Sequence, residues 1–369
     1  MGELVTLLVD RKDISRCEIG VDSVPTSSDL GAGEVLLAVD QFSFTANNIT
    51  YAALGDMLRY WEFFPASDGK GIVPVWGFAD VVASACGDVE VGERLYGYFP
   101  MSTHLVVQPE NITVHGFVDG ASHRQALPII YNQYLRCTQD PLYSAETEAL
   151  QMLLRPLFTT SFLLDDFFAD NQFFGAESLV LTSASSKTAL GMAFLLKHNR
   201  SSRDHKYEIV GLTSLGNIEF VEALGCYDRV LSYDRVTELD STKATATVDF
   251  AGNAELLAGL HNHFSSHLQY SCLVGASHWD QGGASTELPG PVPQMFFAPT
   301  QAQKRVEEWG GPLFQQRLAE VWSVFLNFVD NWMEVKHQTG PEAVARVYSQ
   351  VLSGEFSPKA GYILSLRDK

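Results

Sequence analysis

The sequence predicts an α/β protein with two domains, the first rich in β-strands and the second built on a doubly wound parallel sheet. Three observations predict this class. Strand-like segments alternate with glycine turns in the first third of the chain. From about residue 145 onward, buried strands alternate with helices, which is the rhythm of a parallel sheet. The length of 369 residues exceeds what one small core needs and suits two domains.

The first domain is expected over residues 1–150. Its strands are expected over 33–39, 71–82, 92–99 and 103–107, with glycines and prolines between them. This spacing indicates a barrel-like or irregular β-domain. A helix over 145–154 follows, and Pro156 separates it from another apolar stretch.

The second domain is expected over 151–300 and repeats a strand–turn–helix pattern. Its five strands are expected over 178–182, 207–213, 229–231, 247–252 and 268–274. Its helices are expected over 187–196, 218–224 and 256–264. The last part, 301–369, is expected to contain a long amphipathic helical region over 303–335, a helix over 343–352 and a strand over 361–366.

Composition and charge disfavour several classes of protein. Apolar residues make up 46% and charged residues 19%, which is typical of a globular chain. The formal net charge of −19 disfavours a nucleic-acid partner, although an anionic cofactor needs only a local patch. No run approaches the roughly 20 apolar residues that span a bilayer, and the N-terminus does not resemble a secretion signal. We therefore expect a cytoplasmic protein without a membrane segment.

The five cysteines are widely separated and form no C-x-x-C pair. Neither a structural zinc lobe nor a disulfide framework is therefore expected. We interpret them as buried thiols.

A candidate phosphate-binding turn lies between the first strand and the first helix of the second domain. It reads Ser183-Ala184-Ser185-Ser186-Lys187-Thr188. Such a turn aims the N–H groups of the following helix beyond the carboxyl edge of the sheet, where a diphosphate is stabilised. The side chains are small or carry hydroxyls, and the lysine supplies charge. We therefore predict cofactor binding by Ser183, Ser185, Ser186, Lys187 and Thr188.

Two other interpretations of this turn stay open. The glycines of the usual G-x-G-x-x-G motif are missing except for Gly191, so a purely structural turn with a serine N-cap is the main alternative. The run Ser186-Lys187-Thr188 also resembles the end of a P-loop. No glycine stands at the required position before it, which disfavours an ATPase.

The end of the second strand of this domain favours NADP(H) over NAD(H). An NAD site usually places Asp or Glu there, on the ribose 2′-hydroxyl. Here the strand ends in Thr213 and Ser214, whose hydroxyls can donate to a 2′-phosphate, and Asn217 follows closely. Tyr233, after the third strand, is predicted to stack on the adenine or to reach the phosphate. Each of these residues is also common simply in turns.

Several segments resemble the medium-chain dehydrogenase/reductases. Two lie in the first domain: Gly-Ala-Gly-Glu-Val-Leu at 31–36 and Gly-Glu-Arg-Leu-Tyr-Gly at 92–97. Two lie in the second domain: Leu-Gly-Cys-Tyr-Asp-Arg-Val at 224–230 and Val-Asp-Phe-Ala-Gly-Asn at 248–253. The last is Val-Leu-Ser-Gly-Glu at 351–355. The chain is most similar to the zinc-free, quinone oxidoreductase-like branch, in a poorly characterised group with the Ser-Ala-Ser-Ser-Lys-Thr turn. The resemblance implies a GroES-like catalytic domain built from both chain ends, to which 301–369 returns. It also implies a Rossmann domain between these ends, with the active site in the cleft.

The resemblance further implies candidate site residues. Zinc-dependent members use an early Cys, but the matching stretch 44–51 has none, so no metal site is expected. Tyr51 falls where related reductases carry a Tyr near the nicotinamide. Its phenol would polarise a carbonyl or protonate an enolate, unless it is only a core tyrosine. Asn48, like Asn47, would orient substrate or cap a helix.

Gly252 and His278 complete the predicted cofactor-binding residues. Gly252 stands in one of the matching segments, and His278 occupies the region where relatives contact the nicotinamide. Two arginines outside this set, Arg136 and Arg155, are interpreted as ion-pair partners of Asp140, Asp165 or Asp166 rather than as ligands of an acidic substrate.

The turn and the resemblance together predict an NADP(H)-dependent, zinc-independent oxidoreductase. It would reduce an enone, a quinone or another activated carbonyl compound by hydride transfer. The expected partner is a small-molecule substrate, and a homodimer is compatible with the sequence. Two alternatives stay open: a non-redox enzyme of the lyase or isomerase type, and a non-catalytic protein that uses the same scaffold for association.

Overall fold

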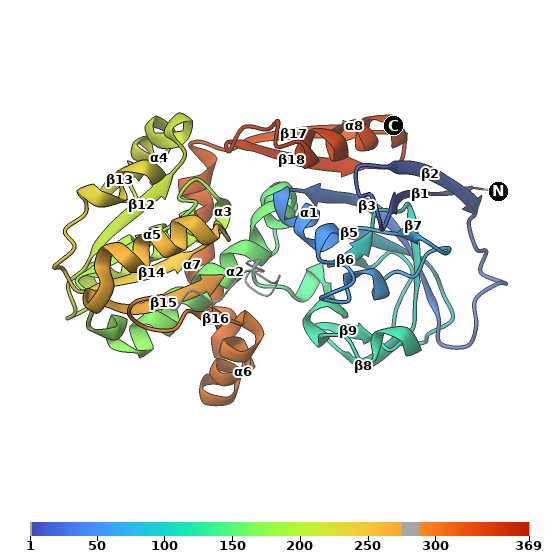
Figure 1. The fold of residues 1–369 in the computed structure, drawn as a ribbon. Coiled ribbons are helices and arrows are strands. Elements are labelled where there is room, and N and C mark those ends of the chain that lie inside the picture. Colours follow the sequence, from blue (N-terminus) through green and yellow to red (C-terminus); the bar gives the residue numbers. More distant parts are fainter. Residues whose placement is uncertain (1, 275–287, 369) are drawn as a thin grey trace. The chain divides into compact units, whose positions relative to one another are not determined.

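The computed structural model describes residues 2–274 and 288–368. The chain forms two compact units (Figure 1). Unit 1 comprises Met1–Arg155 and Met333–Lys369, and unit 2 comprises Pro156–Trp332. The sequence segment 301–369 is therefore divided, because residues 301–332 belong to unit 2 and the rest to unit 1.

Unit 1 consists mainly of antiparallel β-structure. Its strands are β1 (Glu3–Asp10), β2 (Cys17–Ser23), β3 (Val35–Phe44), β4 (Lys70–Gly71), β5 (Pro74–Ser84), β6 (Arg94–Pro100), β7 (His104–Val107), β8 (Pro109–Thr113), β9 (Gly116–Asp119), β10 (Gln133–Arg136), β17 (Glu334–Thr339) and β18 (Ala360–Ser365). Its α-helices are α1 (Ala46–Ala53) and α8 (Pro341–Leu352). The larger sheet has the order β17-β18-β3-β5-β6-β10-β9-β8, with β7 also paired to β3, and the smaller one is β2-β1-β4.

The core of unit 1 lies where α8 covers the larger sheet. Phe44 of β3 packs against Tyr348 of α8, with ring centroids 5.6 Å apart. Both side chains are fully buried, as is Leu364 of β18. The C-terminal segment therefore completes the same core as the N-terminal strands.

Unit 2 is built on a parallel sheet with the order β13-β12-β11-β14-β15-β16. Its strands are β11 (Ser178–Leu181), β12 (Glu208–Thr213), β13 (Arg229–Ser232), β14 (Thr245–Asp249), β15 (Leu268–Val274) and β16 (Gln294–Phe296). Its helices are α2 (Glu148–Asp170, which begins in unit 1), α3 (Lys187–Asn199), α4 (Ile218–Ala223), α5 (Ala254–Phe264), α6 (Ala298–Trp309) and α7 (Gly311–Asp330).

Helices bury both faces of this sheet (Figure 1). On one face, Leu179 and Leu181 of β11 share a cluster with residues of α2 and α3 such as Leu190. On the other face, Val180 clusters with Leu260 of α5. The order, in which the first strand lies centrally and the chain reverses beside it, confirms the predicted doubly wound parallel sheet.

Two helical predictions need correction. The region 303–335 is not helical throughout, since it breaks into α6 and α7 at Gly310, where φ is 83°, and it ends in strand β17. The helix expected over 145–154 is longer than predicted, because α2 runs from Glu148 to Asp170 and includes Pro156. Proline cannot donate to the carbonyl of Met152 one turn earlier, and the hydroxyl of Ser43 donates to that carbonyl instead, at 2.8 Å.

Candidate functional site

The serine turn of unit 2 leads from the central strand β11 into α3. Ser183 adopts a left-handed φ of 48°, a conformation that is costly for a residue with a Cβ. Ser186 is the N-cap of α3, and its hydroxyl accepts a hydrogen bond from the N–H of Ala189 at 3.4 Å. The first turn of α3 therefore begins at the carboxyl edge of the sheet, where helix N–H groups favour an anion.

A glycine on the neighbouring strand makes room for this turn. Ala184 is fully buried and its N–H donates to the carbonyl of Leu212 at 2.9 Å. A Cβ at Gly211 of β12 would lie only 2.9 Å from the Cβ of Ala184. The space that a glycine-rich turn obtains from its own glycines is here supplied by Gly211.

The one glycine retained from the usual motif has a packing role. A Cβ at Gly191 would lie 2.6 Å from the hydroxyl oxygen of Ser161 on α2. That hydroxyl donates to the carbonyl of Thr188 at 2.7 Å, which joins α2 to the first turn of α3. Gly191 thus permits the close approach of the two helices that support the turn.

A polar triad stands beside the turn at the tip of β12. The hydroxyl of Ser185 accepts hydrogen bonds from Thr213 at 3.3 Å and from the amide of Asn217 at 3.1 Å. Thr213 is fully buried and Ser214 is exposed. Because residues 213–217 include no acid, hydroxyl and amide groups meet here without a carboxylate, which fits a phosphate better than a ribose hydroxyl.

Lys187 brings a positive charge to the start of α3. Its side chain is half-buried, and the surrounding protein removes water from its ammonium group. Desolvation lowers the pKa of Lys187 from its usual 10.5 to about 8. Most of the ammonium therefore stays charged at pH 7, in a setting where water screens it weakly.

Two further strand ends meet the turn. Tyr233, at the end of β13, hydrogen-bonds Ser183, and burial raises the pKa of its phenol. The buried carboxylate of Asp249, at the end of β14, accepts from the hydroxyl of Thr182 at 2.6 Å and from the N–H of Ala251 at 3.0 Å. Its other oxygen has no hydrogen-bond partner among the residues that the structure describes.

The sequence analysis did not identify Asp249 as part of this site. The fourth strand was expected over 247–252, which placed Asp249 inside the strand; in the structure β14 ends at Asp249, so this acid lies at the same sheet edge as the turn. The predicted residues that the structure brings to this edge are Ser183, Ser185, Ser186, Lys187, Thr188, Thr213, Ser214 and Tyr233, with Gly252 after β14. His278 lies outside the described residues.

Tyr51 of unit 1 lies on the short helix α1. Its side chain is buried, and its hydroxyl accepts a hydrogen bond from the amide of Asn47 at 2.7 Å. Burial is the main cause that raises the pKa of this phenol well above its ordinary value. The phenol therefore stays protonated at neutral pH and can donate a hydrogen bond.

Asn48 holds α1 in place. Its side-chain oxygen accepts from the N–H of Thr45 at 2.8 Å, which completes a capping box. Its amide donates to the carbonyl of Pro74 at 3.0 Å, and the residue is buried. Both ends of this amide are thus engaged with the backbone, and Asn47 is the amide that contacts Tyr51.

Aromatic rings surround Tyr51. This aromatic cluster comprises Tyr51, Tyr60, Phe63, Trp76, Tyr96, Tyr98 and Tyr131. Tyr98 contacts Tyr51 edge to face with centroids 5.7 Å apart, and it pairs with Trp76 across strands β5 and β6. Sequence reasoning missed the cluster because its members come from separate strands and loops.

The aromatic cluster contains buried polar atoms without partners. The hydroxyls of Tyr96 and Tyr98 and the indole N–H of Trp76 make no hydrogen bond with the described part of the chain. All three groups can donate a hydrogen bond. The ring centroid of Trp76 lies 5.6 Å from that of Tyr96 and 5.1 Å from that of Tyr98. A planar molecule with an oxygen acceptor would satisfy such donors.

The two arginines considered above form ion pairs inside unit 1. Arg136 bonds Glu93 at 2.6 Å, and Arg155 pairs with Asp140, which is buried at 3% exposure of its side chain. The guanidinium of Arg155 also lies over the ring of Tyr96, 4.8 Å from the centroid. The ion-pair interpretation is confirmed for Arg155 and Asp140, whereas Arg136 pairs with Glu93 rather than with one of the acids that we expected.

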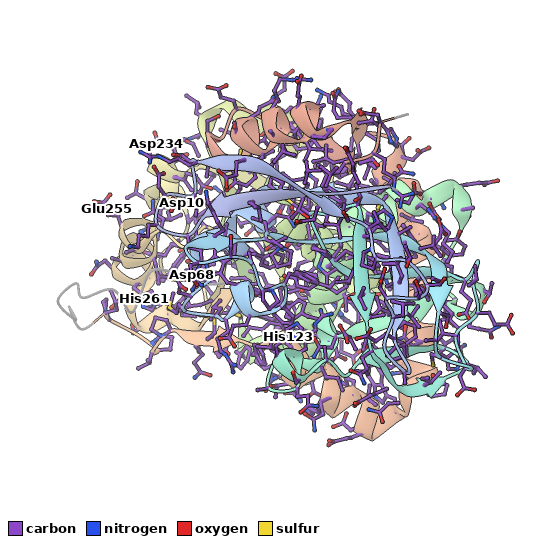
Figure 2. All side chains as sticks on the ribbon, turned by 90° about the vertical axis from the view of Figure 1, so that its right-hand side faces the viewer. Asp10, Asp68, His123, Asp234, Glu255 and His261 are labelled. Carbon is purple, nitrogen blue, oxygen red and sulfur yellow. The ribbon has the colours of Figure 1, made fainter. Side chains whose placement is uncertain are left out.

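Over residues 2–274 and 288–368, no group of three or more His, Cys, Asp or Glu side chains could hold a metal ion. His261 on α5, labelled in Figure 2, is buried and bonded on both ring nitrogens, to the Pro289 carbonyl and the Ser271 hydroxyl, each at 2.9 Å.

Over the described residues 2–274 and 288–368, no helix combines the length and the apolar character needed to cross a membrane. The five cysteines are free; Cys137, Cys226 and Cys272 are buried as expected, whereas Cys17 and Cys86 are only partly buried.

Comparison with known sequences identifies the family. The chain belongs to DUF2855, a family described as protein of unknown function, whose model matches residues 42–357. No curated protein matches the sequence.

Solved structures share the fold over the whole chain. CurA from Vibrio vulnificus has a TM-score of 0.62 at 12% identity, with 99% of each chain covered. CurA from the same organism in complex with NADPH has a TM-score of 0.61 at 11% identity, with 100% of this chain and 99% of that chain covered. A putative NADPH:quinone reductase from Mesorhizobium loti has a TM-score of 0.63 at 13% identity, with 99% and 98% covered.

One of these neighbours is described as a putative NADPH:quinone reductase, and CurA was solved both alone and in complex with NADPH. The chain therefore shares the fold of these structures over its whole length, with one unit rich in β-strands and one unit built on a parallel sheet. The comparison confirms the predicted fold class and the resemblance on which it was based.

Proposed function

We propose that this protein is a zinc-independent, NADPH-dependent reductase that acts on an enone, a quinone or another activated carbonyl compound. The observation that carries the proposal is the serine turn at the start of α3, with the triad of Ser185, Thr213 and Asn217 beside it. Proteins of the same fold support it, since CurA from Vibrio vulnificus was solved with NADPH bound.

The residues at the turn fit the phosphates of NADPH. The N–H groups at the start of α3 and the ammonium of Lys187 would hold the diphosphate. Ser185, Thr213, Ser214 and Asn217 would hold the 2′-phosphate through hydroxyl and amide donors. The carboxylate of Asp249 lies at the same sheet edge, where one of its oxygens accepts hydrogen bonds from Thr182 and Ala251.

In unit 1, Tyr51 is the proposed donor to the substrate carbonyl. When bound, NADPH supplies the hydride. The protonated phenol of Tyr51 would stabilise negative charge that develops on the substrate oxygen. Asn47 holds that phenol in position through its 2.7 Å hydrogen bond, and the surrounding rings exclude water. Asn48 supports the same helix through its cap.

Cofactor titration tests this proposal. We expect NADPH to quench tryptophan fluorescence and to bind at least about tenfold more tightly than NADH, a difference of about 1.4 kcal/mol. Ser185→Ala removes the acceptor shared by Thr213 and Asn217, so it should weaken NADPH binding several-fold and leave NADH binding unchanged. The proposal would be wrong if the protein bound NADPH and NADH with equal affinity, or if it bound neither.

A panel of enones and quinones, with NADPH oxidation followed by absorbance, tests the redox reaction. Turnover of any member supports reductase activity. A protein that retains NADPH through purification but oxidises it with no member of the panel would instead support the non-redox alternative.

A further inference from the structure

We propose that Tyr227 is a positioning residue for the dinucleotide, because it fixes the peptide plane that aims the N–H of Ser185 at the phosphates. The inference rests on the proposed function. Tyr227 lies between α4 and β13, and its ring is buried. Its hydroxyl donates to the carbonyl of Ala184, within the serine turn, at 3.0 Å.

The ring of Tyr227 lies against Gly211 of the neighbouring strand β12. A Cβ at Gly211 would lie 2.9 Å from the Cδ1 atom of Tyr227 and equally close to the Cβ of Ala184. Gly211 therefore leaves space for both. Tyr227 and Gly211 act together, because a change at either residue would move Ala184.

Peptide geometry links this contact to the cofactor. A trans peptide unit is planar, and its C=O and N–H point in opposite directions. The unit between Ala184 and Ser185 is trans, because the chain as described has no cis peptide bond. When Tyr227 holds the carbonyl of Ala184 toward the buried side, the N–H of Ser185 must point away from it.

This N–H is available for a ligand. Within the described residues, no backbone carbonyl accepts a hydrogen bond from the N–H of Ser185. Those of Ala184 and Ser186, in contrast, donate to Leu212 at 2.9 Å and to Ser183 at 2.7 Å. The N–H groups of Ala184 and Ser186 are therefore bonded within the protein, and the N–H of Ser185 between them is left for a ligand.

Backbone strain explains why such a contact is needed. Ser183 holds a φ of 48° without being glycine, a conformation that persists only where surrounding contacts enforce it. A glycine-rich turn reaches similar conformations without steric cost. Tyr227 therefore compensates for the missing glycine at position 183, because its hydrogen bond anchors Ala184, the next residue.

Tyr227→Phe tests the inference, because it keeps the ring and removes only the hydroxyl. We expect the Kd for NADPH, measured by calorimetry, and the KM for NADPH to rise about five- to tenfold while kcat stays within about twofold. Tyr207→Phe is the control, since its hydroxyl lies beside the other end of β12, where it donates to the Leu196 carbonyl at 2.8 Å and accepts from Arg203 at 2.8 Å. The control should lose at least as much thermal stability without a change in the Kd.

The outcomes separate this inference from the proposed function. Weaker NADPH binding in Tyr227→Phe alone supports the positioning role. If both variants bind NADPH as the wild type does, the inference is wrong and the proposed function stands. If both variants weaken binding equally, the effect is one of stability and the positioning role is wrong. If the wild type does not bind NADPH, the proposed function fails and this inference fails with it.

Discussion

The two candidate sites hold their polar groups in opposite ways. Around the serine turn of unit 2, Ser185 bonds Thr213 and Asn217, and Tyr227 bonds the turn backbone. In the aromatic cluster of unit 1, the hydroxyl of Tyr98 and the indole N–H of Trp76 are buried without partners.

This difference indicates two kinds of preparation for a ligand. A network of satisfied hydrogen bonds fixes donors in advance, which suits an anion with constant geometry such as a diphosphate. An unpartnered buried donor raises the free energy of the empty protein by roughly 1–3 kcal/mol, and a ligand acceptor recovers that cost. The aromatic cluster of unit 1 thus holds several unsatisfied side-chain donors, whereas the hydroxyls at the serine turn are bonded to one another and the N–H of Ser185 is the backbone donor left for a ligand.

The largest effect that would sharpen this comparison is expected at Tyr51. Tyr51→Phe removes the proposed donor to the substrate oxygen, so kcat should fall by about 10²-fold, as for loss of one oxyanion donor. Steady-state kinetics should show the KM for NADPH unchanged. The control is Tyr348→Phe, a buried tyrosine of unit 1 whose hydroxyl donates to the carbonyl of Ile14. A kcat for Tyr51→Phe equal to that of the control would remove Tyr51 from the chemistry.

A smaller effect is expected from the charge of Lys187. Its pKa of about 8 lies well below the usual 10.5, because desolvation disfavours the ammonium. Bound phosphate favours the ammonium and raises this pKa, so NADPH affinity should be constant just below pH 8. Above pH 8 affinity should fall, by at most about tenfold per pH unit, as Lys187 of the protein without NADPH loses its proton.

Lys187→Arg isolates that effect. Arginine stays charged throughout this range, so the Kd measured between pH 7 and pH 9.5 should lose its dependence on pH. Lys187→Met should weaken binding about tenfold at pH 7. A wild-type Kd that is flat across the range would show that Lys187 does not face the phosphates.

The smallest effect is expected from Tyr98→Phe, which tests the comparison most directly. Its hydroxyl has no partner in the described structure, so its removal should leave the free energy of unfolding unchanged or raise it slightly. Tyr227→Phe loses a made hydrogen bond and should cost about 1 kcal/mol. Urea unfolding curves measure both. A clear loss of stability in Tyr98→Phe would mean that its hydroxyl is satisfied in the folded protein.

Much of unit 2 could be predicted from sequence because its strands are short, buried and separated by helices of regular period. The serine turn was found because it lies between one strand and the next helix. The roles of Gly211 and Tyr227 could not be predicted, since they depend on which strand lies beside β11. The strands β1 and β2 of unit 1 were not predicted at all.

Local sequence thus determined the identity of the elements in unit 2, the absence of an acid at the end of β12 and the small, polar composition of the turn. These follow from periodicity and from residues close together in the chain. Tertiary structure alone decided that Asn47 rather than Asn48 contacts Tyr51, that rings from β5, β6 and separate loops gather there, and that Tyr227 orients Ala184. The physical reason is that burial and hydrogen bonding depend on neighbours in space, and a sequence does not state which distant segments become neighbours.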